Sequence, residues 1–454
     1  MLVNKKRIEK INKSQLKKGE FVAYWMQASP RLEYNQALGY AIEKANELNQ
    51  PLLIFFLIDA KFPEAKTAHF KFMLQGLKEL KTKLKNEDFN FYLIDYNKLE
   101  DIKQITKKAS LLISEKAYLK HLRKWKNQVA AKVKIPFYLV ESNLICPIEE
   151  VSDKEEYAAY TIRKKINKIK NEYLKEYQLQ RLKNKNKIEF ENKNLKFVKN
   201  LNQYLENKNF ELQQDLSDHF RGGYKAAKLK LNDFLKNKLK DYEEKRNIPH
   251  LNFQSDLSPY LHFGQIAAQE IALAALNSEY DEKSFLEELI VRRELAFNFV
   301  YYNQNYDGSL KDILYDWAYQ SLMEHQADER EYLYTYQELE NAKTHDKYWN
   351  AAQKEMLLTG KMHNYMRMYW GKKILEWNSD PEEAYQWALK LNNKYSLDGR
   401  DANSYAGVAW IFSKHDRAWK ERKIFGKVRY MNAAGLERKF EMEKYIAKIN
   451  ELTN

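Results

Sequence analysis

The stretch PLLIFFLI at residues 51–58 decides the fold class, because its seven consecutive apolar residues are typical of a strand buried on both faces. Four more runs share this character: FVAYW (21–25), FNFYLID (89–95), ASLLIS (109–114) and IPFYLVES (135–142). Amphipathic stretches lie between the runs, at 33–48, 67–86 and 118–133. Alternating strands and helices predict a Rossmann-like parallel sheet wrapped by helices, so we expect an α/β domain over residues 20–150. An N-terminal extension over residues 1–19 would precede it.

The pattern changes after this domain. Residues 151–215 begin with helical spacing and continue as KNKNKIEFENKNLKFVKN (183–200), which is charged and poor in large apolar residues. We expect an interdomain connector there, partly helical and exposed. Helical periods dominate from 216 to 454, without convincing strands. The sequence therefore predicts an α/β domain, a connector and an all-α C-terminal domain.

Composition narrows the class of protein. The net charge of +14 suits a polyanionic partner, but it also suits a Lys- and Asn-rich chain that stays in solution, and charge alone leaves both open. Cys146 is the only cysteine, which excludes an internal disulfide and suits a reducing cytoplasm. The longest apolar run has seven residues and the N-terminus lacks the apolar core of a signal peptide, so we expect no membrane association. No hydrolytic or metal-binding constellation is present.

Two motifs open the helical domain. In QSDLSPYLHFG (254–264), hydroxyls and a proline at a helix start can form a phosphate site, although an ordinary helix cap has the same pattern. In FLEELIVRRELAFNF (285–299), most charged residues are expected to form surface pairs four residues apart, such as Glu288 with Arg292. One carboxylate turned towards a cavity is the alternative.

Two more motifs follow. Trp370 and Trp377 are two helical turns apart, which suits either a redox relay or a packed core. The stretch 397–432 holds a glycine-containing loop and then six Lys or Arg residues against one acid between 417 and 429, with aromatic residues interleaved. This mixture favours contacts to phosphates and stacking with bases over a merely solvated surface.

Five blocks in this order resemble the signature blocks of class II cyclobutane pyrimidine dimer photolyases, within the photolyase and cryptochrome family. They are LSPYLHFG, EELIVRREL, TGKMHNYMRMYW with KKILEW, DGRD with NSY and GVAW, and FGKVRYMN. The resemblance covers the helical domain and reaches back to FVAYWMQASPR (21–31) and DKEEYAAYTIRKKI (153–166). It implies an all-α C-terminal domain that binds FAD.

The resemblance also implies roles for single residues. The segment for the FAD phosphates comprises Tyr242, Gln254, Ser255, Asp256, Leu257 and Ser258. The flavin ring would be contacted by Arg367, Asp398, Gly399, Arg400 and either Asn392 or Asn403, between which the sequence does not decide. Glu288 matches the carboxylate that hydrogen-bonds the dimer and stabilises its radical anion. The lesion and DNA contacts would come from Arg246, Asn364, Met368, Trp410, Lys427 and Arg429, and the photoreducing chain from Trp349, Trp370 and Trp377.

The function implied is light-driven repair, in which an electron passes from excited FADH⁻ to a pyrimidine dimer flipped out of double-stranded DNA. A cryptochrome-like blue-light signalling flavoprotein is the alternative, and so is a helical DNA-binding protein without a cofactor. An antenna chromophore, a deazaflavin or a folate, could sit in the N-terminal domain. Val291 stands where class I enzymes have tryptophan and favours class II, whereas Lys423 stands where proline is expected. We expect a cytoplasmic monomer.

Overall fold

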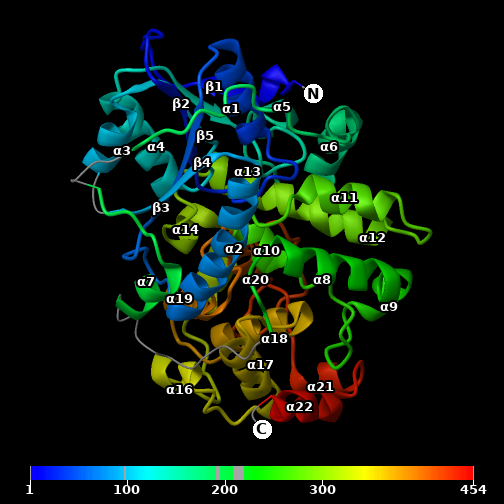
Figure 1. The fold of residues 1–454 in the computed structure, drawn as a ribbon. Helices are drawn as coiled ribbons and strands as arrows, with labels where there is room; N and C mark the ends of the chain where they lie inside the picture. Colours follow the sequence, from blue (N-terminus) through cyan, green and yellow to red (C-terminus); the bar gives the residue numbers. More distant parts are fainter. Residues whose placement is uncertain (1, 97–98, 191–194, 208–218, 453–454) are drawn as a thin grey trace.

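The computed structural model describes residues 2–96, 99–190, 195–207 and 219–452. Figure 1 shows an α/β body that carries the N-terminus and a helical body that carries the C-terminus, with the long helix α2 (Thr67–Asn86) running from the first towards the second. The structure confirms both predictions of fold class, an α/β N-terminal domain and an all-α C-terminal domain. In the described residues no helix is long and apolar enough to cross a membrane.

The sheet has six described strands in the order β1-β6-β5-β2-β3-β4. Their bounds are β1 Ile8–Lys10, β2 Phe21–Met26, β3 Leu52–Ile58, β4 Asn90–Asp95, β5 Ala109–Glu115 and β6 Phe137–Val140. All neighbouring strands are parallel except β1, which pairs antiparallel with β6. Every residue of β3 is buried, as its apolar run requires.

Helices cover both faces of the sheet. The helices α1 (Gln36–Glu47) and α2 pack on one face, and α3 (Leu99–Thr106) and α4 (Lys120–Lys132) pack on the other. Three of the four were predicted. The helix α3 was missed because LEDIKQIT offers barely two turns of periodicity.

Two predicted segments behave differently from the expectation. The N-terminal extension contributes the edge strand β1, whose residues pair with Tyr138 to Val140. The predicted connector is not simply exposed, because Ile162 and Ile166 of α6 (Ala159–Tyr173) are buried against the helical domain. Farther along, Tyr177 and Leu182 pack on the sheet. The helical spacing at the start of the segment agrees with α6, but the apolar residues after it are scattered among charged ones and gave no periodicity from which their packing could be foreseen. Residues 191–194 and 208–215 of the predicted connector, and 216–218 of the predicted helical domain, lie outside the described residues.

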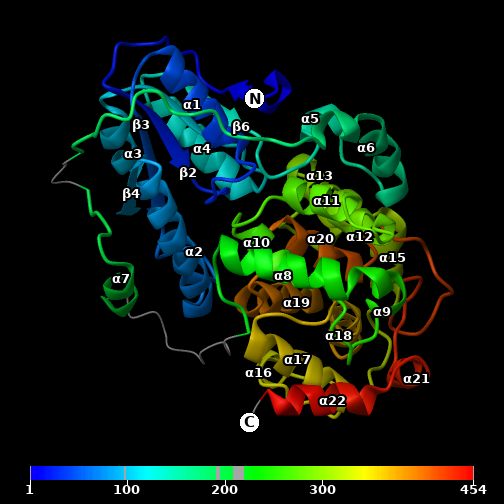
Figure 2. The same ribbon diagram turned by 45° about the vertical axis from the view of Figure 1, so that its right-hand side comes forward.

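The helical domain is built of helices only, in the part of it that the structure describes (Figure 2). Two shorter helices precede it, α5 (Ile148–Val151) and α7 (Leu201–Asn207). Its elements are α8 Tyr224–Asn237, η2 Leu239–Asp241, α9 Tyr242–Lys245, α10 Ser258–His262, α11 Ala268–Leu276, α12 Lys283–Leu286, η3 Glu287–Arg292, α13 Arg293–Tyr302, α14 Leu310–Ile313, α15 Asp316–Glu324, α16 Tyr336–Glu340, α17 Lys347–Thr359, α18 Asn364–Glu376, α19 Pro381–Tyr395, α20 Ala402–Ile411, α21 Ala433–Glu437 and α22 Met442–Glu451. The 3-10 turn η1 (Lys5–Arg7) lies at the other end of the chain.

The strand order reverses between β2 and β5, which places a crevice at the carboxyl ends of these strands. A cavity of about 230 Å³ lies there, between the sheet and the helical domain. Its walls include Glu115 from the end of β5, Phe56 from β3 and Arg400 from the loop before α20. The fold thus forms a ligand-sized space between its two domains.

Candidate functional site

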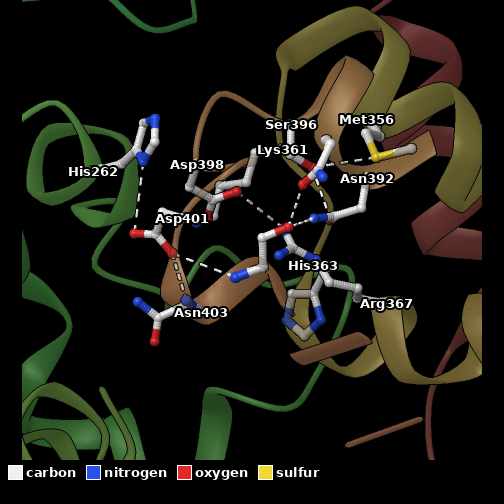
Figure 3. A network of polar contacts seen from close by, with 12 residues as sticks. His262, Met356, Lys361, His363, Arg367, Asn392, Ser396, Asp398, Asp401 and Asn403 are labelled. Carbon is white, nitrogen blue, oxygen red and sulfur yellow. Dashed lines mark hydrogen bonds and ion pairs between the residues drawn. The ribbon is translucent and has the colours of Figure 1, made fainter. Parts of the chain in front are cut away.

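A cluster of polar side chains lies between α10, α18, α19 and α20 (Figure 3). Arg367 of α18 pairs with Asp398, with 3.5 Å between Nη2 and Oδ1. Lys361, just before α18, forms an ion pair with Asp256, which precedes α10. Residues more than one hundred positions apart are therefore brought together, as the resemblance implied for Asp256, Arg367 and Asp398.

Several buried polar atoms of this cluster have no hydrogen-bond partner in the described part of the chain. They are Asp256 Oδ2, His363 Nε2 and Arg367 Nε, together with Asp398 Oδ1 and His262 Nδ1, which have only ion-pair contacts, at 3.5 Å to Arg367 and at 3.6 Å to Asp401. Buried polar groups without a partner are costly, so their concentration in one place indicates a polar ligand. Cationic donors beside a carboxylate fit both the phosphates and the polar ring edge of a flavin dinucleotide.

The electrostatics hold the acids of the cluster in their charged form. Burial alone would raise the pKa of Asp398, but Arg367 and a hydrogen bond from Ser258 outweigh it and lower this pKa. The pKa of Asp256 is also lowered, because the charge of Lys361 outweighs the burial that would raise it. Burial, followed by the charge of Lys361, lowers the pKa of His363 to about 3, so this imidazole is neutral.

Lys361 and His363 lie in the block TGKMHNYMRMYW, but neither of them was assigned a role from the sequence. Gly360-Lys361 resembles the end of a phosphate loop, but Met362 stands where Ser or Thr is required. In the structure Gly360 ends α17 in the left-handed conformation, as a helix cap rather than a phosphate loop. The contact of Lys361 with Asp256 spans 105 positions, so no local spacing could reveal it.

The two candidate asparagines differ in environment. Asn392 is buried, and its amide donates to the Ser404 hydroxyl at 2.7 Å, whereas Asn403 is exposed at the start of α20. The Arg400 side chain, expected at the flavin, instead points to the interdomain cavity and contacts His69 Nε2 at 3.0 Å. Its backbone has a φ of 63°, in the left-handed region that residues other than glycine seldom adopt.

A second group of predicted residues lies at the π-helical turn η3. Arg246 Nη1 pairs with Glu288 Oε1 at 2.8 Å, and the Arg246 guanidinium lies 5.5 Å from the ring centre of Tyr242. The predicted surface pair of Glu288 with Arg292 does not form, because Arg292 approaches Glu287 at 3.4 Å instead. The π-helical turn shifts the register of the side chains and so leaves Glu288 facing Arg246.

The remaining predicted DNA contacts lie on α18, on α20 and in the loop that follows α20. Asn364 is exposed at the first residue of α18, and Met368 is half-buried one turn later. The Arg429 guanidinium lies 6.0 Å from the ring centre of Trp410 and 5.2 Å from that of Trp419. Lys427 is exposed beside it. A basic aromatic surface is thus formed as the composition of this loop predicted.

The three tryptophans form one row. The rings of Trp370 and Trp349 are stacked at 6.3 Å with an interplanar angle of 9°, and those of Trp349 and Trp377 lie 5.6 Å apart. Trp349 is therefore the middle member, although Trp370 and Trp377 are the sequence neighbours. Arg367 of the polar cluster lies one turn before Trp370 on α18, which places one end of the row next to the cluster.

The interdomain cavity is mostly apolar, with Phe56, Leu57, Phe62, Phe70 and Trp125 in its walls. Its polar groups include His69, whose pKa is lowered well below its ordinary value by burial and then by the Arg400 charge. An apolar cavity with a few polar side chains suits a planar aromatic ligand.

The two-domain architecture is shared with photolyases and cryptochromes. The photolyase of Sulfolobus tokodaii, solved with two FAD molecules, matches with a TM-score of 0.71 and 18% identity, covering 94% of this chain and 89% of that one. The cryptochrome of Synechocystis gives a TM-score of 0.71 with 16% identity, covering 96% and 89%. The chain thus has the fold of photolyases and cryptochromes.

Sequence similarity narrows this class further. A DNA photolyase family model matches residues 22–184. The deoxyribodipyrimidine photo-lyase of Methanothermobacter thermautotrophicus is 44% identical over 454 residues, 99% of both chains. That of Arabidopsis thaliana is 39% identical over 451 residues, 95% of this chain and 89% of its own. The chain belongs to the DNA photolyase family.

Proposed function

We propose that this protein is a deoxyribodipyrimidine photo-lyase of class II, which repairs cyclobutane pyrimidine dimers in double-stranded DNA with FAD and light. The observation that carries the proposal is the similarity to an enzyme of this name along 99% of both chains. The cytoplasm, where a buried unpaired Cys146 stays reduced, is the proposed compartment, and a monomer the proposed state.

In this proposal the polar cluster holds FAD, which supplies the excited electron when it is bound. Lys361 and the start of α10 offer donors for the phosphates. The Arg367–Asp398 pair and one of Asn392 and Asn403 would contact the polar ring edge. The five buried polar atoms that make no hydrogen bond support this assignment.

The lesion would enter between η3 and α18. A dimer is poorly stacked and paired, so it leaves the duplex at low cost. Arg246, Asn364, Met368 and Trp410 would surround it, and Glu288 would stabilise the negative charge that develops on it. Because Glu288 is paired with Arg246 at 2.8 Å, this pair must open or be shared when the dimer binds.

The interdomain cavity is the proposed antenna site. It lies where the strand order reverses, at the carboxyl ends of the strands, and its lining is largely aromatic and aliphatic. A deazaflavin and a folate both remain candidates for its chromophore.

A repair assay tests the proposal. The protein, reduced with dithionite, is incubated with an oligonucleotide that contains a thymine dimer, in blue light and in the dark. We expect dimer loss only in light. Bound flavin without dimer loss would point to a cryptochrome, and the absence of flavin would refute both functions.

A further inference from the structure

The π-helical turn η3 is wound more loosely than the α-helices on either side of it. The backbone N–H of Arg293 donates to the carbonyl of Glu288, five residues earlier. The side chains keep the same spacing, because Arg292 Nε approaches Glu287 Oε1 at 3.4 Å, and these two residues are also five apart. In an α-helical register Arg292 would lie over Glu288, four residues before it. The register of the turn therefore decides whether Glu288 meets Arg292 or Arg246.

The C-terminal end of the turn is fixed to the segment after β6. Arg293 Nη1 donates to the Asn143 carbonyl at 3.1 Å. Glu294 accepts a hydrogen bond from the backbone N–H of Ile145 at 2.8 Å. Both side chains are buried. A change of register could not pass through this end of the turn without breaking these contacts, so only the part before the turn is able to rotate.

The N-terminal end of the turn is held by the helix α6 of the connector. Arg163 Nε donates to Glu287 Oε2 at 2.9 Å, and Arg163 Nη2 donates to Glu287 Oε1 at 2.7 Å. A paired contact of this kind fixes the orientation of the carboxylate as well as its distance. The hydrogen bonds from Arg163 are also the main cause of the lowered pKa of Glu287. Ile162 of α6 and Leu289 of the turn belong to the same core cluster.

We propose that Arg163 and Glu287 are positioning residues for Glu288. Their ion pair fixes one end of the π-helical turn, and the contacts of α13 fix the other, so the additional residue of the turn is trapped between them. Glu287 also engages Arg292, which would otherwise compete for Glu288. Without the ion pair the turn relaxes to an α-helical register, and Glu288 leaves Arg246 for Arg292. The inference concerns the lesion role of Glu288 and so rests on the proposed function.

Repair per absorbed photon tests the proposal, measured with chemically reduced enzyme at saturating dimer. We expect the quantum yield of Arg163→Ala to fall to that of Glu288→Ala, while its FAD content stays that of the wild type. In a Glu288→Ala background, Arg163→Ala should cause no further loss, because both changes remove the same interaction. Lys164→Ala, which removes an exposed charge from the same helix, is the control and should keep the wild-type yield. A wild-type yield in Arg163→Ala, or a further loss in the Glu288→Ala background, overturns the proposal.

A rescue experiment separates positioning from a loss of stability. In Glu287→Ala, Arg292 loses its partner and should capture Glu288, so the quantum yield should fall. Removal of this competitor in Glu287→Ala/Arg292→Ala should restore part of the yield. A purely structural role of Glu287 predicts a further loss in the double variant instead. A double variant that recovers nothing therefore contradicts the proposal.

Crystal structures test the register of the turn without any light reaction. In Glu287→Ala we expect Glu288 beside Arg292 and backbone hydrogen bonds that span four residues. A π-helical turn that persists in this variant, with Glu288 still at Arg246, overturns the inference whatever the repair assay gives. A wild type that repairs no dimer refutes the proposed function instead, and the variant structure still decides the register.

Discussion

Glu288 shows how one residue depends on its local backbone. In a regular α-helix it would face Arg292, four positions on, and form a surface pair worth about 0.3–0.5 kcal/mol. The π-helical turn Glu287–Arg292 instead leaves Glu288 against Arg246 at 2.8 Å. The Arg246 guanidinium occupies this carboxyl group, so Glu288 is not free to contact a lesion before the lesion binds. The role of Glu288 would begin only when the dimer displaces Arg246.

Glu288→Ala and Glu288→Gln should therefore differ. If Glu288 donates a hydrogen bond to the dimer during splitting, Gln can replace that donor through its amide and Ala cannot. We expect both variants to keep FAD and most of their dimer affinity, while repair per absorbed photon falls further in Glu288→Ala than in Glu288→Gln. The quantum yield of dimer loss measures this. A wild-type quantum yield in Glu288→Ala would show that the role of Glu288 is purely structural.

At the scale of elements, the loop after α20 is held in place by hydrogen bonds. The backbone N–H of Trp419 donates to the Lys427 carbonyl at 2.9 Å, and that of Lys427 donates to Ser321 Oγ at 2.8 Å. The backbone N–H of Ile424 donates to Asp328 at 2.7 Å. These hydrogen bonds fix the loop to α15 and the turn after it, so its basic side chains are presented in a constant geometry. Lys423, where proline was expected, is exposed and 3.7 Å from Glu329.

Replacement of Lys427 and Arg429 with Ala should weaken DNA binding, because these side chains would no longer neutralise phosphates of the duplex. Each phosphate that a variant leaves unneutralised should reduce the slope of log affinity against log salt by about 1. Binding measured over a salt series checks this, with Lys85→Ala on α2 as the control for a change in net charge alone. An unchanged slope in the loop variants would mean that the duplex docks elsewhere.

The strands and most helices of the sheet domain could be predicted, because apolar runs and periods are local signals. The basic aromatic loop and the candidate tryptophans could also be predicted, because their composition and spacing are local signals as well. The ion pair of Lys361 with Asp256, the side chain of Arg400 and the π-helical turn could not, since each depends on a tertiary contact or on backbone geometry. The order within the tryptophan row also comes from packing of α17 against α18, which sequence spacing does not contain.

At the scale of the whole molecule, Glu294 joins the two domains. It lies on α13 and accepts hydrogen bonds from the backbone N–H groups of Ile145 and Cys146 at 2.8 Å and 3.2 Å. Burial raises its pKa to about 7, against the lowering effect of these bonds and of Arg293. The folded state therefore holds this proton more tightly than the unfolded chain does.

The raised pKa of Glu294 makes the free energy of unfolding fall as the pH rises. Stability from the protonated Glu294 is present near its unfolded pKa, at about 4.3, and is lost as pH rises through about 7. We expect the free energy of unfolding of the wild type, relative to Glu294→Gln, to fall by about 2–3 kcal/mol between about pH 5 and about pH 8. Urea unfolding at the two pH values measures this, and the exposed Glu243→Gln serves as the control. A pH-independent difference would mean that Glu294 is ionised throughout.

The pairing at the two borders of the sheet has a consequence for self-association. On one side β1 pairs with β6, and on the other the backbone N–H groups of Asp95 and Val198 donate to the carbonyls of Lys196 and Leu93 at 2.9 Å and 2.8 Å. An uncovered strand border is a template on which another chain can add, which is how many sheets aggregate. Here the first ten residues and the charged segment near Lys196, the two stretches that look most dispensable in the sequence, occupy those borders. Their removal would take Val3 and Val198 out of the core, uncover the borders of β6 and β4, and open the protein to edge-to-edge polymerisation.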